Sequence, residues 1–169
     1  MKKFLPLIIF SLLLILIIIG TYKISNQYNN QLINKSLPQL KLRYLYNQNK
    51  YFTNSDLKNN QYYLINFFAS WCSTCIIEHN LLVEMQKLGL DIIGIAWRDF
   101  DDKAKEILEK FTNPYLEVLI DPKNIFGKNL KVNGTPENFL LNKDHIIIWH
   151  KKGPITKQDL IIIKGLINS

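Results

Sequence analysis

The chain has 169 residues, which is enough for one domain with a complete hydrophobic core. Its net charge of +7 comes almost entirely from lysines scattered among acidic residues, with Arg43 and Arg98 as the only arginines. This pattern excludes a nucleic-acid-binding stripe and indicates a solvated surface. Two cysteines are too few for the disulfide framework of a small secreted domain or for a four-ligand zinc site, and the three histidines are not spaced to complete one.

The N-terminal segment begins with Lys2 and Lys3 and continues as a nearly unbroken apolar run over residues 4–20. With the next two residues it approaches the ~20 that cross a bilayer as a helix. A cleaved signal peptide is the alternative, but the run is long for a signal core and no small-x-small site follows it. We therefore predict a retained transmembrane helix at residues 1–22, with the two lysines cytoplasmic and the rest of the chain outside.

Beyond the anchor, residues 23–36 are polar and rich in Asn and Gln, which is typical of a tether, so we expect the folded domain at residues 37–169. Within this domain, period-2 patterns and continuous apolar runs predict strands, and 3.6-residue periods predict helices. The predicted strands are residues 40–46, 51–53, 62–68, 91–97, 116–120, 137–141 and 145–149. The predicted helices are residues 76–88, 101–111, 124–130 and 156–167, with Thr156 as N-cap of the last.

This order of elements alternates strands and helices and then closes with a hairpin and a final helix. It predicts an α/β fold in which a central mixed β-sheet is flanked by helices on both faces. Residues 62–68 are apolar almost throughout, so this strand should lie in the centre of the sheet, covered on both sides.

The segment between that central strand and the next helix contains both cysteines, as Trp71-Cys72-Ser73-Thr74-Cys75. A buried strand that delivers C-x-x-C to the first turn of a helix is typical of a thioredoxin-like redox site. Free backbone N–H groups and the helix dipole would stabilise a thiolate there. We predict Cys72 as the attacking nucleophile and Cys75 as a more deeply buried resolving thiol.

The alternative for the two cysteines is a purely structural disulfide. A bridge between Cys72 and Cys75 closes a very small loop and would constrain the unfolded chain little, so a redox-active disulfide is the better interpretation. It would need no other cofactor. Trp71 either shields the site or packs in the interior.

Four further residues are candidates for supporting roles. Thr135 and Pro136 precede the predicted hairpin, where a cis proline in a tight turn would expose the Thr135 backbone to an extended peptide. Glu78 follows Cys75 by three positions on the same helix and is either a proton carrier for the thiols or a solvated glutamate. Asn66 should point toward the site by strand alternation, but an amide cannot accept a proton as a carboxylate does.

These residues resemble a known family, the DsbE/CcmG thioredoxin-like proteins of cytochrome c maturation. The resemblance covers the chain from about residue 38 to its end and rests on five segments: Asn66-Phe-Phe-Ala-Ser-Trp-Cys72, Cys75-Ile-Ile-Glu-His79, Asn113-Pro-Tyr115, Gly134-Thr-Pro-Glu137 with Phe139-Leu-Leu141, and Gly153-Pro154. Asn66 and Glu78 are more discriminating than C-x-x-C, because general thioredoxins carry an acid at the position of Asn66. The N-terminal anchor agrees with the family, whereas this chain has Ser73-Thr74 between the cysteines, where members of the family often have a proline.

The resemblance implies a membrane-anchored enzyme of the inner membrane that faces the periplasm and reduces disulfides. Its implied clients are apocytochrome c, at the haem-binding Cys-x-x-Cys-His, or cytochrome c assembly proteins. A membrane electron carrier of the DsbD/CcdA type would re-reduce the Cys72–Cys75 disulfide. The alternatives are a general extracytoplasmic reductase, an oxidant of the DsbA kind, whose inserted helical domain has no counterpart in this sequence, and a non-catalytic chaperone or haem-binding assembly factor.

Overall fold

The computed structural model describes residues 5–30 and 32–168, in two compact units that divide between Gln31 and Leu32. The first unit is helix α1 (Leu5–Asn30), whose large apolar side chains at positions 9, 10 and 12–19 are exposed. Counting the described residues alone, no helix combines the length and apolarity needed to cross a membrane. The lysines at positions 2 and 3, which we used to orient the predicted anchor, lie outside the described residues, so the anchor stays a prediction.

The second unit begins earlier than the sequence predicted. Helix α1 continues to Asn30 through most of the expected tether, and Leu32 and Leu37 are already buried in the core of the folded unit. Ser36 forms a β-bridge with Ile146. The prediction of a tether as far as residue 36 is therefore wrong, because apolar side chains within this polar stretch insert into the core.

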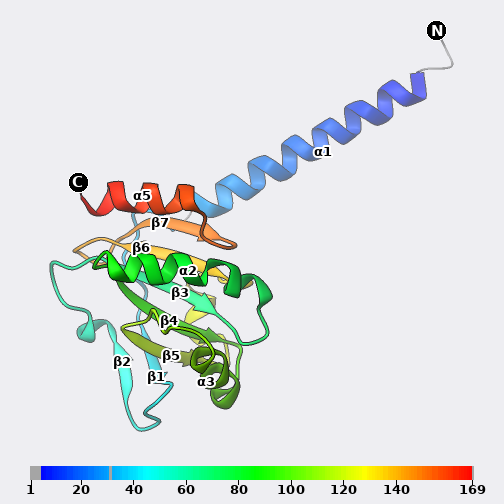
Figure 1. Cartoon of the computed structure of the whole chain (residues 1–169). Coiled ribbons are helices and arrows are strands. Elements are labelled where there is room, and N and C mark those ends of the chain that lie inside the picture. The colour runs from blue at the N-terminus through cyan, green and yellow to red at the C-terminus, as the bar shows by residue number, and fades with distance from the viewer. Residues whose placement is uncertain (1–4, 31, 169) are drawn as a thin grey trace. The chain divides into compact units, whose positions relative to one another are not determined.

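The folded unit is a seven-stranded sheet with helices packed on it (Figure 1). Its strands are β1 (Lys41–Tyr44), β2 (Tyr51–Thr53), β3 (Tyr63–Phe68), β4 (Asp91–Trp97), β5 (Glu117–Asp121), β6 (Glu137–Leu141) and β7 (Ile147–Lys152). Its helices are the 3-10 helix η2 (Asn54–Asp56) and the α-helices α2 (Ser73–Lys87), α3 (Asp101–Glu109), α4 (Ile125–Asn129) and α5 (Lys157–Ile167).

The strands lie in the order β2-β1-β5-β4-β3-β6-β7. Strand β4 pairs in parallel with β3 and β5, while the pairs β3–β6, β6–β7, β1–β5 and β1–β2 are antiparallel. The predicted mixed sheet is confirmed. Strand β3 has neighbours on both sides and is buried along its whole length, as its continuous apolar run predicted.

Alternation along the central strands divides the core between the two faces of the sheet. Tyr63, Ile65 and Phe67 of β3 belong to one apolar cluster, which α4 and the segment that begins at Leu32 cover. Leu64 and Phe68 belong to the other cluster, together with residues of α2, α3 and α5. Figure 1 shows α2 crossing this second face. Asn66 alternates with the same set, so its amide points toward α2.

Two details near the C-terminus show where local sequence signals succeed and fail. Thr156 caps α5 as predicted, with its Oγ1 accepting from the N–H of Asp159. Strand β7, however, begins at Ile147 instead of at 145. His145 has a φ of +57°, and the side chain of Asn142 accepts the Ile146 N–H, so the hairpin turn is longer than its sequence indicated.

Close packing on the α2 face of the sheet requires Gly94 in β4. A Cβ added there would lie 2.8 Å from the ring of Tyr115. That ring stacks on Phe68 at 5.1 Å, and its hydroxyl donates to Asn66 Oδ1 at 2.7 Å, so it has little freedom to move away. The Tyr115 ring can therefore pack against β4 and bond Asn66 because position 94 has no side chain.

We predict that Gly94→Ala lowers the free energy of unfolding by about 1–3 kcal/mol, because the added methyl overpacks a buried contact. Denaturant unfolding measures this loss. Gly165→Ala is the matched control, since Gly165 lies exposed in α5 with no atom near its added Cβ. It should raise the free energy by up to about 1 kcal/mol through helix propensity. Equal effects of the two substitutions would contradict the packing argument.

Candidate active site

The two cysteines lie at the junction between β3 and α2 and form a disulfide, with their Cα atoms 5.4 Å apart. Cys72 is the N-cap residue of α2, in an extended backbone conformation. The N–H of Cys75 donates to Cys72 Sγ at 3.1 Å, and Thr74 Oγ1 lies 3.4 Å from the same sulfur. A thiolate on Cys72 would therefore meet donors already aimed at it, at the positive end of a helix.

Burial of the two cysteines differs from the sequence prediction. Cys72 is only 5% exposed, whereas Cys75 is half-buried at the margin of the core. The prediction that Cys75 lies deeper is wrong for this disulfide-bonded state. The reason is a small opening on the α3 side of the disulfide, which leaves Cys75 less covered. The distinct role of Cys72 rests on its position at the helix start and not on exposure.

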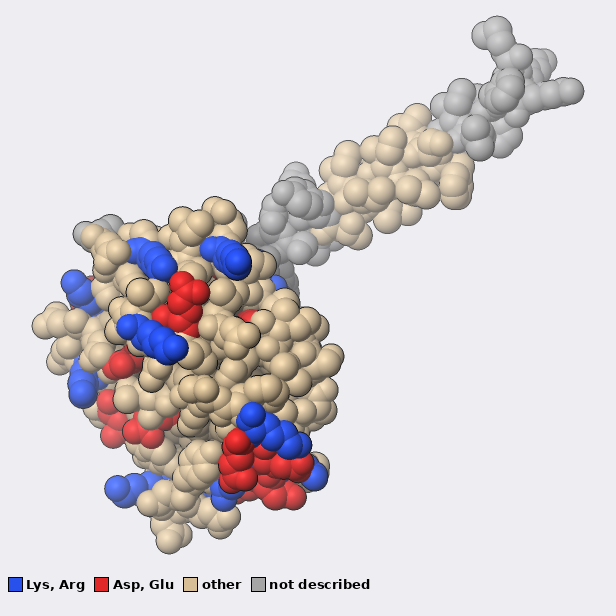
Figure 2. All heavy atoms as spheres, in the orientation of Figure 1, with Lys and Arg blue, Asp and Glu red and all other residues tan. Residues whose placement is uncertain are grey.

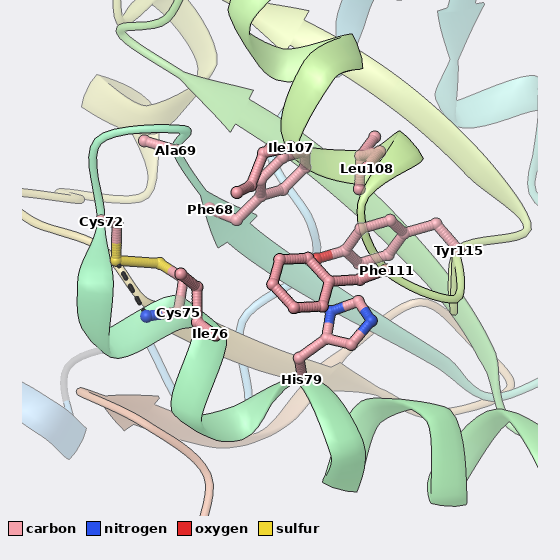
Figure 3. Close-up of a pocket in the computed structure, with 10 residues that line it drawn as sticks. All are labelled: Phe68, Ala69, Cys72, Cys75, Ile76, His79, Ile107, Leu108, Phe111 and Tyr115. Carbon is pink, nitrogen blue, oxygen red and sulfur yellow. Dashed lines mark hydrogen bonds between the residues drawn. A yellow bond between two sulfur atoms is a disulfide. The ribbon is translucent and has the colours of Figure 1, made fainter.

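That opening is a cavity of about 30 Å³ beside the disulfide (Figure 3). Its lining is mostly apolar: Phe68, Ala69, Cys72, Cys75, Ile76, His79, Ile107, Leu108, Phe111 and Tyr115. The volume suits one or two water molecules and no larger ligand. His79 bonds the Thr112 carbonyl at 2.6 Å and contacts Phe111, so it closes one side of the cavity.

The loop between β3 and α2 is held by a carboxylate that sequence reasoning missed. Asp99 is buried and accepts from the N–H of Ser70 at 2.6 Å, from its hydroxyl at 2.8 Å and from the Phe100 N–H at 2.9 Å. Next to Ser70, the ring of Trp71 is 58% exposed and donates from Nε1 to the Arg98 carbonyl at 3.4 Å. Trp71 is thus a surface residue beside Cys72 and not an interior packing residue.

The Thr135–Pro136 peptide bond is cis, as predicted. The following residue, Glu137, pairs with Phe67 in the antiparallel β3–β6 ladder. Pro136 therefore lies at the end of β3 from which the chain leads to Cys72. Thr135 Oγ1 is buried and makes no hydrogen bond among the described residues.

Glu78 and Asn66, predicted from spacing, meet inside the protein. Both are fully buried, and Asn66 Nδ2 donates to Glu78 Oε1 at 2.7 Å. Glu78 Oε2 accepts from Asn138 Nδ2 at 3.1 Å and from the Ile155 N–H at 2.7 Å. Tyr115 completes the network through Asn66 Oδ1. A solvated glutamate is excluded. The three added partners lie far from Glu78 in sequence, and no local pattern indicates them.

The network sets the protonation of its carboxyl group. Burial raises the pKa of Glu78 from 4.5 to about 7, and the bonds from the Ile155 N–H, Asn66 and Asn138 offset this only in part. Burial and the nearby Glu78 charge also raise the pKa of Tyr115 well above its usual value, so its hydroxyl stays a donor. A group with a pKa near neutral can both take and give a proton. Elsewhere in the described part of the chain, no three His, Cys, Asp or Glu side chains gather as metal ligands would.

We predict that Glu78 makes stability fall as pH rises between about 4.5 and 7. In this window the folded protein keeps a proton that the unfolded chain has released, so unfolding releases a proton and higher pH favours it. The loss should total on the order of 3 kcal/mol. Denaturant unfolding at about pH 5 and about pH 8 measures it.

Glu78→Gln should remove most of that pH dependence while lowering stability overall, because an amide N–H then faces the Asn66 donor. The control is Glu84→Gln on the exposed side of α2, which should retain the wild-type slope. A Glu78→Gln slope equal to that of wild type would show that Glu78 keeps its ordinary pKa.

Comparison with known proteins shows the family to which this chain belongs. The Redoxin family model matches residues 32–164. HelX of Rhodobacter capsulatus, a thiol:disulfide interchange protein, is 36% identical over 67% of this chain and 64% of its own, and the interchange protein DsbE of Yersinia pestis is 31% identical over 90% and 84%. The thioredoxin domain of a Bacteroides vulgatus thiol-disulfide oxidoreductase superposes with a TM-score of 0.69 at 16% identity, over 80% of this chain and 98% of that one, which shows a thioredoxin-like fold. The chain belongs to the redoxin family and, within it, to the DsbE thiol:disulfide interchange proteins.

Proposed function

We propose that this protein is a membrane-anchored reductase on the periplasmic side of the inner membrane, which reduces apocytochrome c or its assembly partners during cytochrome c maturation. The observation that carries the redox part is the hydrogen bond from the Cys75 N–H to Cys72 Sγ at the start of α2. It supports Cys72 as the sulfur that is stabilised as a thiolate and therefore attacks.

The reaction follows from this assignment. The Cys72 thiolate attacks one sulfur of a client disulfide, the other client sulfur leaves as a thiolate, and a mixed disulfide joins the two proteins. Cys75 then loses its proton and attacks Cys72 Sγ, which releases the second client thiol and forms the Cys72–Cys75 disulfide. Two electrons have passed to the client. A membrane electron carrier of the DsbD/CcdA type would return two electrons to the pair.

Two features support a reductive role toward an unfolded client. Glu78 follows Cys75 by one helical turn, and its pKa of about 7 suits it to receive the proton of the resolving thiol at neutral pH. The cis-proline loop leaves the Thr135 backbone next to the end of β3, where an extended segment can pair with it. Apocytochrome c offers its cysteines in such a segment before haem attachment.

The membrane assignment rests on the apolar run of the sequence at residues 4–20. A domain anchored in the membrane would be close to its membrane electron carrier and to client polypeptides at the membrane surface. The electron source is a second reason to propose anchoring, because a reductase in an oxidising compartment must be re-reduced continually.

We predict that Cys72→Ser abolishes client reduction, whereas Cys75→Ser accumulates a mixed disulfide between Cys72 and the client. The first variant lacks the attacking sulfur, and the second lacks the sulfur that resolves the intermediate. Non-reducing electrophoresis of the second variant, followed by identification of the attached protein, measures this. Capture of apocytochrome c or an assembly protein supports the proposal, while a broad range of secreted proteins would indicate a general extracytoplasmic reductase.

Two further measurements could overturn the reductive role. A Cys72→Ser variant that still supports cytochrome c maturation in cells would indicate a non-catalytic chaperone or haem-binding factor. A reduction potential near that of strong oxidants, about −120 mV, would indicate an oxidant of the DsbA kind. The double variant without both cysteines is the background control.

We predict that the protein fractionates with the inner membrane and stays there after an alkaline carbonate wash, because an apolar helix is held by the bilayer and not by surface charge. Deleting residues 1–22 should release the domain into the soluble periplasmic or cytosolic fraction. The intact mass of the membrane form should include residue 1 or 2. A mature chain that begins after residue 20 would show that the segment is a cleaved signal peptide.

A further inference from the structure

Arg98 follows β4 directly and has a left-handed backbone, with a φ of +49°. This conformation is uncommon and strained for a residue other than glycine, so its surroundings must impose it. They do so from both sides: its N–H donates to the Asp121 carbonyl at 3.0 Å, and its carbonyl accepts from Trp71 Nε1. The backbone that carries the Arg98 side chain is therefore fixed beside the redox loop.

The guanidinium group is held as well, but among the described residues it has no anionic partner. Its central carbon lies 4.7 Å from the centre of the Trp97 ring, which is a cation–π stack. Arg98 is exposed, and none of the ion pairs within the described part of the chain includes it. The adjacent carboxylate, Asp99, is already bonded to Ser70 and the Phe100 N–H. The N–H donors of Arg98 are thus exposed beside the Trp97 ring, without a carboxylate partner among the described residues.

Position 98 carries an arginine in a chain whose other basic residues are nearly all lysines. All but two of the chain's basic residues are lysines, and the other arginine, Arg43, bonds the Asp101 carboxylate at 2.7 Å. Arginine differs from lysine in its planar fork of donors, which matches a carboxylate at two points and stacks on aromatic rings. Arg98 stacks in this way, yet no carboxylate of the described residues completes the arrangement.

The location of this group ties it to the disulfide. The Trp97 ring lies 6.2 Å from the ring of Trp71, which is exposed and precedes Cys72. The ring of Trp97, which is itself buried, therefore lies next to both the exposed Trp71 ring and the Arg98 guanidinium group. Trp71 also lines a groove of about 210 Å³ together with residues of α3, where Glu106 already pairs with both Lys103 and Lys110.

We propose that Arg98 and Trp71 recognise an acidic side chain, Asp or Glu, that lies close to the reactive cysteine of the client polypeptide. The guanidinium group takes the carboxylate at two points, and the Trp71 ring packs against the adjoining client chain. The contact favours formation of the mixed disulfide and takes no part in the electron transfer. This inference rests on the proposed thiol–disulfide exchange and adds a sequence preference to it.

The test is a double-mutant cycle on the rate of mixed-disulfide formation. Reduced Cys75→Ser protein reacts with short peptides whose cysteine is blocked by a chromogenic thiol, and release of that thiol gives the second-order rate constant. The peptides carry Glu or Gln at successive positions on either side of the cysteine. The protein either retains Arg98 or carries Arg98→Asn, a substitution that tolerates the left-handed backbone. The cycle cancels the effect of Glu on the peptide's own reactivity.

At one or more positions, we expect the ratio of the Glu-peptide rate constant to the Gln-peptide rate constant to be roughly fivefold higher with Arg98 than with Arg98→Asn. This is the effect of a well-placed exposed ion pair. The preference should weaken in high salt. Arg98→Lys should retain part of it, because the charge remains but the fork is lost. Lys110→Gln removes one positive charge from the mixed-charge surface over α3 (Figure 2) and should leave the preference unchanged.

Two outcomes would overturn the inference: the same Glu-to-Gln ratio with Arg98 and with Arg98→Asn at every position, or an equal loss of preference in Lys110→Gln, which would reflect overall charge. Unchanged rates with the Gln peptides show that exchange itself is intact in the variants. Failure of all proteins with all peptides would instead overturn the proposed function. Unfolding of each variant by denaturant checks that the fold is retained.

Discussion

The structure around the redox site depends on one buried carboxyl group. Glu78 projects from α2 into the protein, where an ionisable side chain is costly unless its oxygens are bonded. Its partners come from β3, from β6 and from the backbone just before α5. These elements can satisfy Glu78 only in one relative arrangement. The helix that begins at the disulfide is thereby held in position on the sheet, while the group that holds it remains able to exchange a proton near neutral pH.

The surface beside the disulfide is organised by a second set of polar contacts, at the ends of the parallel strands. Asp99 follows β4 and fixes the loop that leads to Cys72, and Asp121, at the end of β5, fixes the backbone of Arg98. Asp121 also accepts the N–H groups of Ile125 and Gly127 through its side chain and so orients α4. Sites in α/β proteins form at this edge because several loops leave the sheet there together. Here each of these loops is bonded to its neighbour, so the surface is already formed when a client arrives.

Much of this could be predicted from the sequence, where the signal is local. The apolar run of β3, the C-x-x-C before α2, the cap at Thr156 and the proline of the cis bond can each be recognised within a few residues. The side-chain periods also placed Asn66 on the face of α2. What local patterns cannot supply is the set of partners brought together by the fold, such as Asn138 and Tyr115, which lie 72 and 49 positions from Asn66.

The sequence-based errors have the same origin. Leu32 lies in a polar stretch, so the sequence around it indicates a tether. Only the folded core shows that its side chain is buried. Cys75 was expected to lie deeper than Cys72, but its exposure depends on how closely α3 approaches, and neither cysteine carries information about α3. Strand β7 starts late because one side chain, Asn142, rearranges the turn before it. For Leu32 and Cys75 a tertiary contact overrides the local preference, and for β7 a side-chain hydrogen bond within the turn does so.

One bond in the Glu78 network differs in kind from the others. Asn66 and Asn138 contribute side chains, but Ile155 contributes its main-chain N–H. Every amino acid except proline supplies that donor, so the residue at 155 can be chosen for its fit in the core alone. The hydrogen bond that links α2 to the segment before α5 is therefore made by the backbone. Almost any substitution at position 155 would keep its donor.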